Sequence, residues 1–269
     1  MTPSHSQLLP EQLTESGEVF ASARNITDQG LQQYFTPPPL AALFASVMAC
    51  PQVFTVADLT AGSGNLLSAF AEYERVHTFG IELDHRFRNR ELGIEEANIL
   101  RASPYLRELE VRFDKLVLNP PFGLKWEWDG KQVNSAALTV RLGCELLDDS
   151  GEGVCILDER NLPEALDEMR AAECEAYTVW HISNLFAPAS AVKCAVVWFY
   201  NGARELACHE ESFDFGQFKK VTPALERKLL QARRPLWFTH SDSEAAHETR
   251  TAFSACCKAA RDEAAAEGQ

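Results

Sequence analysis

The segment Val53–Leu67 reads VFTVADLTAGSGNLL. Its first part, Val53–Asp58, is apolar and β-branched up to the final acid, which is the pattern of a buried strand. A Gly-x-Gly turn follows at Gly62 and Gly64, and a helix is expected from about Asn65. Such a strand–turn–helix unit binds nucleotide-type ligands, because the glycines let the backbone approach the ligand and the helix N-terminus offers free amides. The segment therefore predicts an α/β fold with a binding site at this turn.

The next predicted strand, His77–Glu82, ends in an acid about twenty residues beyond the turn, where a carboxylate can accept both hydroxyls of a ribose. Leu67 stands where a dinucleotide fingerprint has its third glycine. The unit therefore favours a mononucleoside-type ligand over NAD. A purely structural turn beside a solvated acid remains the alternative.

A further buried strand, Phe113–Leu118, stops at Asn119–Pro120–Pro121–Phe122. Since proline cannot continue a central strand, Asn119 is expected at the carboxyl end of the strand, where open α/β sheets bind ligands. The Asn119 side-chain oxygen and the Pro120 carbonyl can accept both hydrogens of a planar amine and so favour its attack on a methyl donor. Phe122 can offer a ring face to a flipped-out base. A tight Pro-Pro turn with Asn119 as a local cap explains the same residues equally well.

Strand and helix patterns alternate along the chain and end in two adjacent strands, Ala176–Ile182 and Lys193–Tyr200. This order predicts a mainly parallel sheet with one antiparallel edge strand. Residues 1–30 have the pattern of an amphipathic lead-in helix, and the character of the sequence changes again after residue 201.

The net charge of −14 argues against a protein that coats nucleic acid non-specifically, because neutralising phosphates requires Lys and Arg. Eight scattered cysteines without a CxxC pair indicate reduced thiols in a cytoplasmic protein, and their spacing fits no metal site. No segment approaches the about 20 apolar residues of a membrane span. The dense basic stretch at 219–234 is either a phosphate-binding face or a solvated helix face, and its cations are Lys219, Lys220, Arg227, Lys228, Arg233 and Arg234.

Taken together, the motifs resemble the class I S-adenosylmethionine-dependent adenine (N6) methyltransferases of DNA, including the modification subunits of type I restriction systems. The resemblance covers about residues 31–200, with the cofactor motifs before the catalytic tetrapeptide, as in the gamma group. It is carried by Gln33–Pro37, Asp58–Gly64, Gly80–Asp84 and Asn119–Phe122, and the stretch from Phe186 to Trp198 is similar to the final hairpin of that branch.

The resemblance implies a Rossmann-like α/β fold with a mainly parallel seven-stranded sheet, one antiparallel edge strand and helices on both faces. The implied domains are a helical lead-in over 1–30, a methyltransferase domain over 31–201 and a small helical C-terminal extension over 202–269. It also implies S-adenosylmethionine as cofactor, DNA as substrate and no metal. Relatives carry or borrow a recognition domain, so a specificity subunit is an expected partner of this chain.

The resemblance also implies site residues. Asn119, Pro120, Pro121 and Phe122 would form the catalytic set. Glu82 would hold the cofactor ribose, and Asn98 would touch the cofactor adenine. The complete set of implied cofactor contacts is Tyr34, Phe35, Thr36, Pro37, Asp58, Thr60, Ala61, Gly62, Gly64, Asn65, Leu66, Glu82, Leu83, Asn98, Ile99 and Asn119. Trp126 and the cations of residues 219–234 are candidate nucleic-acid contacts.

Two other functions remain open at the level of sequence. The same acceptor geometry suits the amine of an RNA adenine or the side-chain amide of a protein glutamine. A non-catalytic, cofactor-binding subunit of a restriction or defence complex would also account for the acidic charge and the missing recognition domain.

Overall fold

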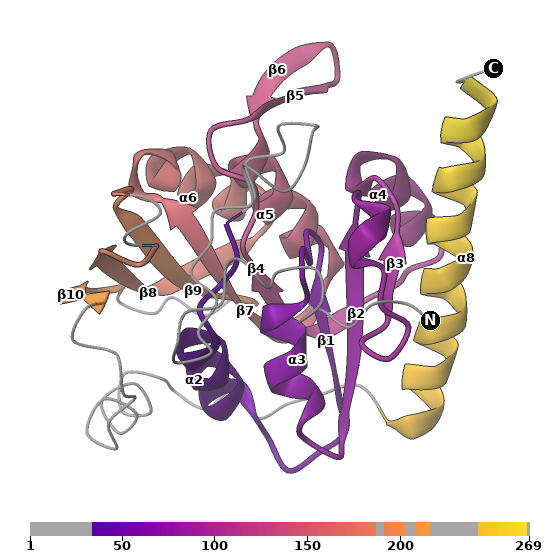
Figure 1. The fold of residues 1–269 in the computed structure, drawn as a ribbon, viewed down its shortest axis with the longest axis horizontal. Helices are drawn as coiled ribbons and strands as arrows, with labels where there is room; N and C mark the ends of the chain where they lie inside the picture. The colour runs from indigo at the N-terminus through magenta and orange to yellow at the C-terminus, as the bar shows by residue number, and fades with distance from the viewer. Residues whose placement is uncertain (1–33, 187–190, 203–207, 216–241, 268–269) are drawn as a thin grey trace.

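The computed structural model describes residues 34–186, 191–202, 208–215 and 242–267 (Figure 1). The described residues form an eight-stranded sheet in the order β10-β8-β9-β7-β4-β1-β2-β3, and β5 and β6 form a separate hairpin. The strands are β1 (Phe54–Asp58), β2 (Val76–Glu82), β3 (Ile94–Glu96), β4 (Phe113–Leu118), β5 (Lys125–Trp128), β6 (Lys131–Asn134), β7 (Leu147–Asp158), β8 (Cys174–Ser183), β9 (Cys194–Asn201) and β10 (His209–Asp214).

Helices connect the strands and cover both faces of the sheet. The α-helices are α2 (Pro38–Met48), α3 (Asn65–Ala71), α4 (Ile99–Glu108), α5 (Ser135–Leu146), α6 (Leu162–Ala171) and α8 (Ser243–Glu267), with short 3-10 turns η3 (His85–Phe87) and η4 (Glu159–Asn161). None of the helices within these described segments is both long and apolar enough to cross a membrane.

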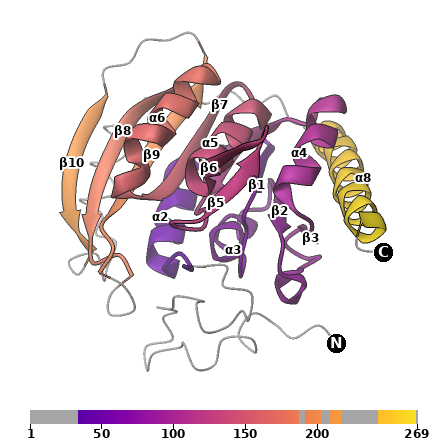
Figure 2. The ribbon, with the colours of Figure 1, turned by 90° about the horizontal axis from the view of Figure 1, so that it is seen from above.

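Alternation along the strands divides the core into two layers. On β4, Val117 packs with α2 and α3, whereas Leu116 and Leu118 pack with α4, α5, α6 and α8. Successive side chains of a strand point to opposite faces, so a continuously apolar strand requires a helical layer on each side. Figure 2 shows these layers, with α2 and α3 on one side of the sheet and α5 and α6 on the other. The predicted α/β class is confirmed.

The predicted sheet needs two corrections. Strand β9 is antiparallel to both β7 and β8, so the antiparallel strand lies inside the sheet and not at its edge. At this end of the sheet the edge strand is β10, which pairs in parallel with β8, so the main sheet of the described residues has eight strands and not seven. Strand β9 is almost wholly buried, as an interior strand should be, while the largely polar sequence of β10 gives no strand signal.

The C-terminal helix α8 is part of the same core. Phe253 contacts the rings of Phe79 and Phe113 at centroid distances of 5.4 and 6.1 Å. The Arg250 guanidinium lies 4.0 Å from the centre of the Phe79 ring and also donates to the Thr78 carbonyl. The segment 202–269 therefore contributes both a sheet strand and a core helix, where the sequence predicted only a small helical extension.

A buried ion pair lies between the central strands β4 and β7. Lys115 Nζ is 2.7 Å from Glu152 Oε1, and the two side chains are 1% and 0% exposed. The two residues are register partners in the sheet. Because each charge is removed from water, each depends on the other for compensation.

We predict that Lys115→Met destabilises the protein by about 3–5 kcal/mol, because it leaves the Glu152 carboxylate buried without its cation. The double variant Lys115→Met/Glu152→Leu should lose much less, since it removes both charges. Urea unfolding of Lys115→Met, Glu152→Leu and the double variant measures this coupling. Strictly additive losses would show that the pair is not coupled.

Candidate active site

A cavity lies at the carboxyl ends of β1, β2 and β4. Its empty space is about 900 Å³, including space open to solvent. The predicted site residues that line it are Tyr34, Phe35, Thr36, Asp58, Thr60, Ala61, Gly62, Asn65, Leu66, Glu82, Leu83, Asn98, Ile99, Asn119, Pro121 and Trp126.

Four predicted residues do not line the cavity. Pro37 and Gly64 precede helices α2 and α3 as N-cap residues, Pro120 lies in the loop after β4, and Phe122 is in the core.

Sequence reasoning missed six lining residues, which are Leu59, Ser63, Ile81, Ala97, Leu100 and Leu124. Most of these are direct neighbours of predicted residues, so adjacency to the motifs was the available signal. The predicted basic contacts at 219–234 lie outside the described residues.

The glycine turn after β1 has the conformation that glycine permits. Gly62 and Gly64 have φ angles of 52° and 79°, in the left-handed region. A Cβ at Gly62 would also lie 3.3 Å from Phe35 Cε1. Side chains here would strain the backbone and narrow the space beside Phe35. The turn therefore leaves room for a ligand against the backbone.

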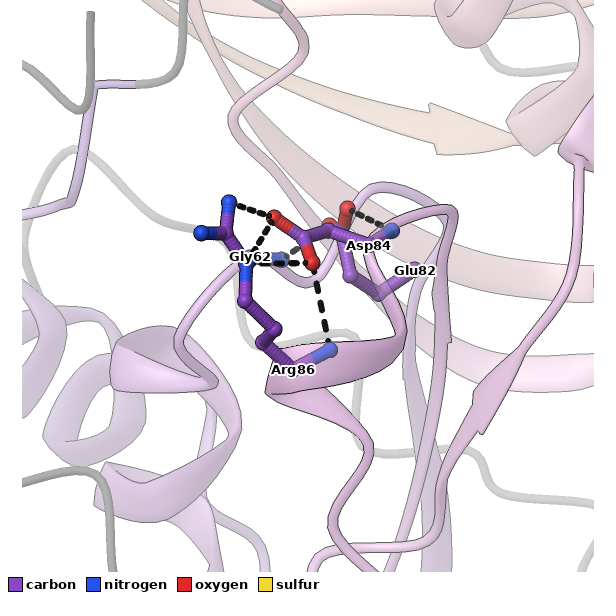
Figure 3. A network of polar contacts seen from close by, with 4 residues as sticks. All are labelled: Gly62, Glu82, Asp84 and Arg86. Atoms are coloured by element: carbon purple, nitrogen blue, oxygen red, sulfur yellow. Dashed lines mark hydrogen bonds and ion pairs between the residues drawn. The ribbon is translucent and has the colours of Figure 1, made fainter. Parts of the chain in front are cut away.

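Glu82 ties this turn to the end of β2 (Figure 3). Its two carboxylate oxygens accept hydrogen bonds from Gly62 N at 2.7 Å and from Asp84 N at 2.9 Å. Asp84 is itself paired with Arg86, whose Nη2 lies 2.7 Å from Asp84 Oδ2. Glu82 also lines the cavity, so these bonds hold a carboxylate where hydroxyl groups of a ligand would meet it.

The acids of the cavity ionise near neutral pH. Burial raises the pKa of Asp58 to about 8, and the nearby charge of Glu82 adds to this rise. Burial likewise raises the pKa of Glu82 to about 7, although hydrogen bonds from Asp84 N and Gly62 N oppose the shift. A cationic ligand would favour the ionised form of both groups. The cavity therefore suits a ligand that carries positive charge.

Asn119 presents an unused acceptor. Its Nδ2 donates to the Tyr34 carbonyl at 2.5 Å and to Thr36 Oγ1 at 3.1 Å. Because a carbonyl can only accept, the amide nitrogen must face Tyr34, and this fixes which way the amide oxygen points. Asn119 Oδ1 is buried and has no hydrogen-bond partner among the described residues. A buried acceptor of this kind is costly unless a donor binds to it.

Phe122 offers no open ring face, in contrast to the role expected from the sequence. It is 3% exposed, and the Tyr34 ring stacks on it with centroids 5.3 Å apart and an interplanar angle of 27°. Phe186 contacts it edge-on at 5.8 Å. Tyr34, not Phe122, is the aromatic residue that faces the cavity beside Asn119.

Comparison with known proteins finds a family match and structural neighbours. The family model for N-6 DNA methylase matches residues 18–141, slightly less than half of the chain. The M protein of the type I restriction enzyme EcoKI is 20% identical, with a TM-score of 0.55, over 68% of this chain and 48% of that protein. No curated protein sequence matches the chain significantly.

Two further solved structures share the fold. The methyltransferase subunit of a type I restriction-modification system from Streptococcus thermophilus is 20% identical with a TM-score of 0.57, over 74% of this chain and 52% of that one. A Listeria monocytogenes protein described as a class I S-adenosylmethionine-dependent methyltransferase is 11% identical with a TM-score of 0.56, over 79% of this chain and 74% of that one.

The chain spans about half the length of the two type I proteins. The structural neighbours confirm the class I methyltransferase fold. The family match includes both the glycine turn and the tetrapeptide, and it confirms the resemblance to adenine-specific methyltransferases inferred from the motifs.

We predict that the protein loses stability as the pH rises. The pKa of Asp58 is about 8 in the folded chain against an ordinary 3.8, so the folded state holds this proton more tightly than the unfolded state. The free energy of unfolding should therefore fall between about pH 4 and pH 8. Melting temperatures across this range should decrease less in Asp58→Asn than in the wild type. Parallel curves for the two proteins would show that Asp58 does not titrate in this way.

Proposed function

We propose that this chain is an S-adenosylmethionine-dependent methyltransferase that acts on the exocyclic N6 amine of adenine in DNA. The observation that carries the proposal is the Asn119 amide, which is held by Tyr34 and Thr36 and keeps a buried, unpaired oxygen in a residue that lines the cavity. The fold and the N-6 DNA methylase match support the same activity.

Asn119 activates the amine in this proposal. The lone pair of an exocyclic amine is delocalised into the base, so the nitrogen is a weak nucleophile. Asn119 Oδ1 accepts one amine hydrogen. The Pro120 carbonyl, which the loop after β4 holds outside the cavity lining, would turn towards the bound amine to accept the other. Positive charge develops on the nitrogen as it attacks, so both hydrogen bonds strengthen in the transition state. Neither acceptor is basic enough to retain a proton, so the methylated amine releases its extra proton to solvent.

The cavity residues fit the proposed cofactor. When bound, S-adenosylmethionine supplies an activated methyl group on a sulfonium ion. Gly62 allows close approach to the backbone, and Glu82 accepts hydrogen bonds from the ribose hydroxyls. Asn98 Oδ1 accepts from Leu100 N at 2.9 Å, which leaves the NH₂ group of Asn98 to meet the adenine. Asp58 and Glu82, once ionised, stabilise the positive charge.

DNA recognition is proposed to involve a partner. A specificity subunit, as expected from the resemblance to the type I modification subunits, is proposed to supply contacts to the DNA. The basic residues 219–234 are proposed to contact phosphate groups. This arrangement offsets the cost of extruding a base from the helix with contacts made outside the catalytic domain.

The first test of the activity replaces Asn119. We predict that Asn119→Ala lowers methyl transfer from labelled S-adenosylmethionine to DNA by at least about 10²–10³-fold, because the transition state loses its acceptor. Affinity for the cofactor should change little. Thr36→Val is the control, since it removes one support of the Asn119 amide but keeps Oδ1, and it should retain measurable activity.

The same assay distinguishes the acceptors. Each protein is incubated with DNA, RNA and protein substrates, alone and with a candidate specificity subunit. Labelling of RNA adenine or protein glutamine without DNA would overturn the DNA assignment. Full activity of Asn119→Ala on DNA would overturn the proposed role of the amide.

We also predict that cofactor affinity rises with pH. A sulfonium cation binds better to ionised Asp58 and Glu82, whose pKa values are about 8 and 7. Calorimetric titration should therefore give a lower Kd at about pH 8.5 than at about pH 6, with release of protons on binding. The increase should be smaller in Asp58→Asn. A Kd that does not vary with pH would exclude this coupling.

A further inference from the structure

The β5–β6 hairpin stands at the upper end of the molecule in Figure 1, and its residue Trp126 lines the cavity. Trp126 pairs with Val133 across the two antiparallel strands. At the tip, Asp129 and Gly130 have φ angles of 51° and 71°, as in a two-residue hairpin turn. No atom would lie within 4 Å of a Cβ at Gly130, so the tip extends away from the rest of the described structure.

The base of the hairpin is joined to the catalytic loop. Ser135 N donates to the Leu124 carbonyl at 3.0 Å, and Ser135 Oγ donates to the Pro121 carbonyl at 2.9 Å. Ser135 is buried and begins helix α5. These bonds hold the two ends of the hairpin together directly after the tetrapeptide, so its position relative to the cavity is defined.

One face of strand β5 is turned towards the protein. Lys125 and Glu127 are exposed, whereas Trp126 and Trp128 are half-buried. Both indoles pack against the hydrophobic cluster that contains Ile99. Only the first of them is among the described residues that line the cavity. The two tryptophans thus share a strand, a face and a neighbouring cluster but differ in access to the cavity.

Leu83 provides a second apolar surface in the same cavity. The residue is 49% exposed, it lines the cavity, and it follows Glu82 directly. The segment Ala97–Leu100 also lines this space. A flat heterocycle bound between these groups would cover apolar surface on Leu83 and on the Trp126 indole.

We propose that Trp126 stacks on the adenine ring of S-adenosylmethionine, so that the hairpin β5–β6 is part of the cofactor site and not of the nucleic-acid surface. This inference rests on the proposed function. The charges of the hairpin agree with it, because Lys125 and Lys131 are balanced by Glu127 and Asp129. A phosphate-binding hairpin would need a surplus of positive charge.

The test compares matched variants at Trp126 and Trp128. Removing an aromatic platform beneath a base costs about 1–3 kcal/mol, so Trp126→Ala should weaken S-adenosylmethionine binding by roughly 5- to 150-fold in calorimetric titration. Trp128→Ala should leave the affinity almost unchanged. A second pair of variants, Trp126→Phe and Trp128→Phe, changes less of each side chain. The cofactor should quench tryptophan emission in Trp128→Phe but not in Trp126→Phe. Circular dichroism checks that all four variants are folded.

Equal loss of affinity in both alanine variants, or full quenching in Trp126→Phe, would overturn the inference. So would a Trp126→Ala variant that binds the cofactor normally but binds DNA weakly, since that result would assign the residue to nucleic acid. These outcomes leave the proposed function intact. Failure of the wild-type protein to bind S-adenosylmethionine would instead overturn the proposed function together with the inference.

Discussion

The parallel pairing of β4, β1, β2 and β3 is the constraint on which the site depends. Register pairs such as Ala57 with Leu116 and Asp58 with Gly80 bring the carboxyl ends of these strands to one edge. Every backbone turn that leaves this edge then faces the same cavity. Asn119 can therefore bond to Tyr34, which is 85 positions away in the sequence. The chemistry of the cavity follows from sheet geometry rather than from proximity along the chain.

Two kinds of polar group share that edge and have complementary tasks in the proposed reaction. Asp58 and Glu82 are buried acids whose ionisation is costly until a cation is present. Asn119 is a neutral acceptor whose oxygen is left over after its NH₂ group is satisfied. The acids favour a positively charged methyl donor, and the amide favours an amine that becomes positive as it reacts. Neither task requires a metal or a strong base.

The sequence predicted the parts of this arrangement that depend on local chemistry. The glycine turn, the acid that ends β2 and the strand that stops at Asn119 each have a pattern in adjacent residues. The order of the strands has no such pattern, because the place of β9 between β7 and β8 is decided by tertiary pairing. The stacking of the Tyr34 ring on Phe122 was not predictable either, because the two residues come from distant segments that only the tertiary structure brings together. Leu124 is an ordinary apolar residue with no predicted neighbour, and only the fold reveals its position in the cavity.

The contacts of Tyr34 give one residue two structural roles. Its backbone carbonyl accepts from the Asn119 amide, while its ring covers Phe122. A stacked aromatic pair of this kind contributes about 0.5–1.5 kcal/mol. The packing of the two rings therefore also limits how far the Tyr34 carbonyl can move from the Asn119 amide. Removing the Tyr34 ring would loosen the orientation of that amide, even though the hydrogen bond itself is made by the backbone.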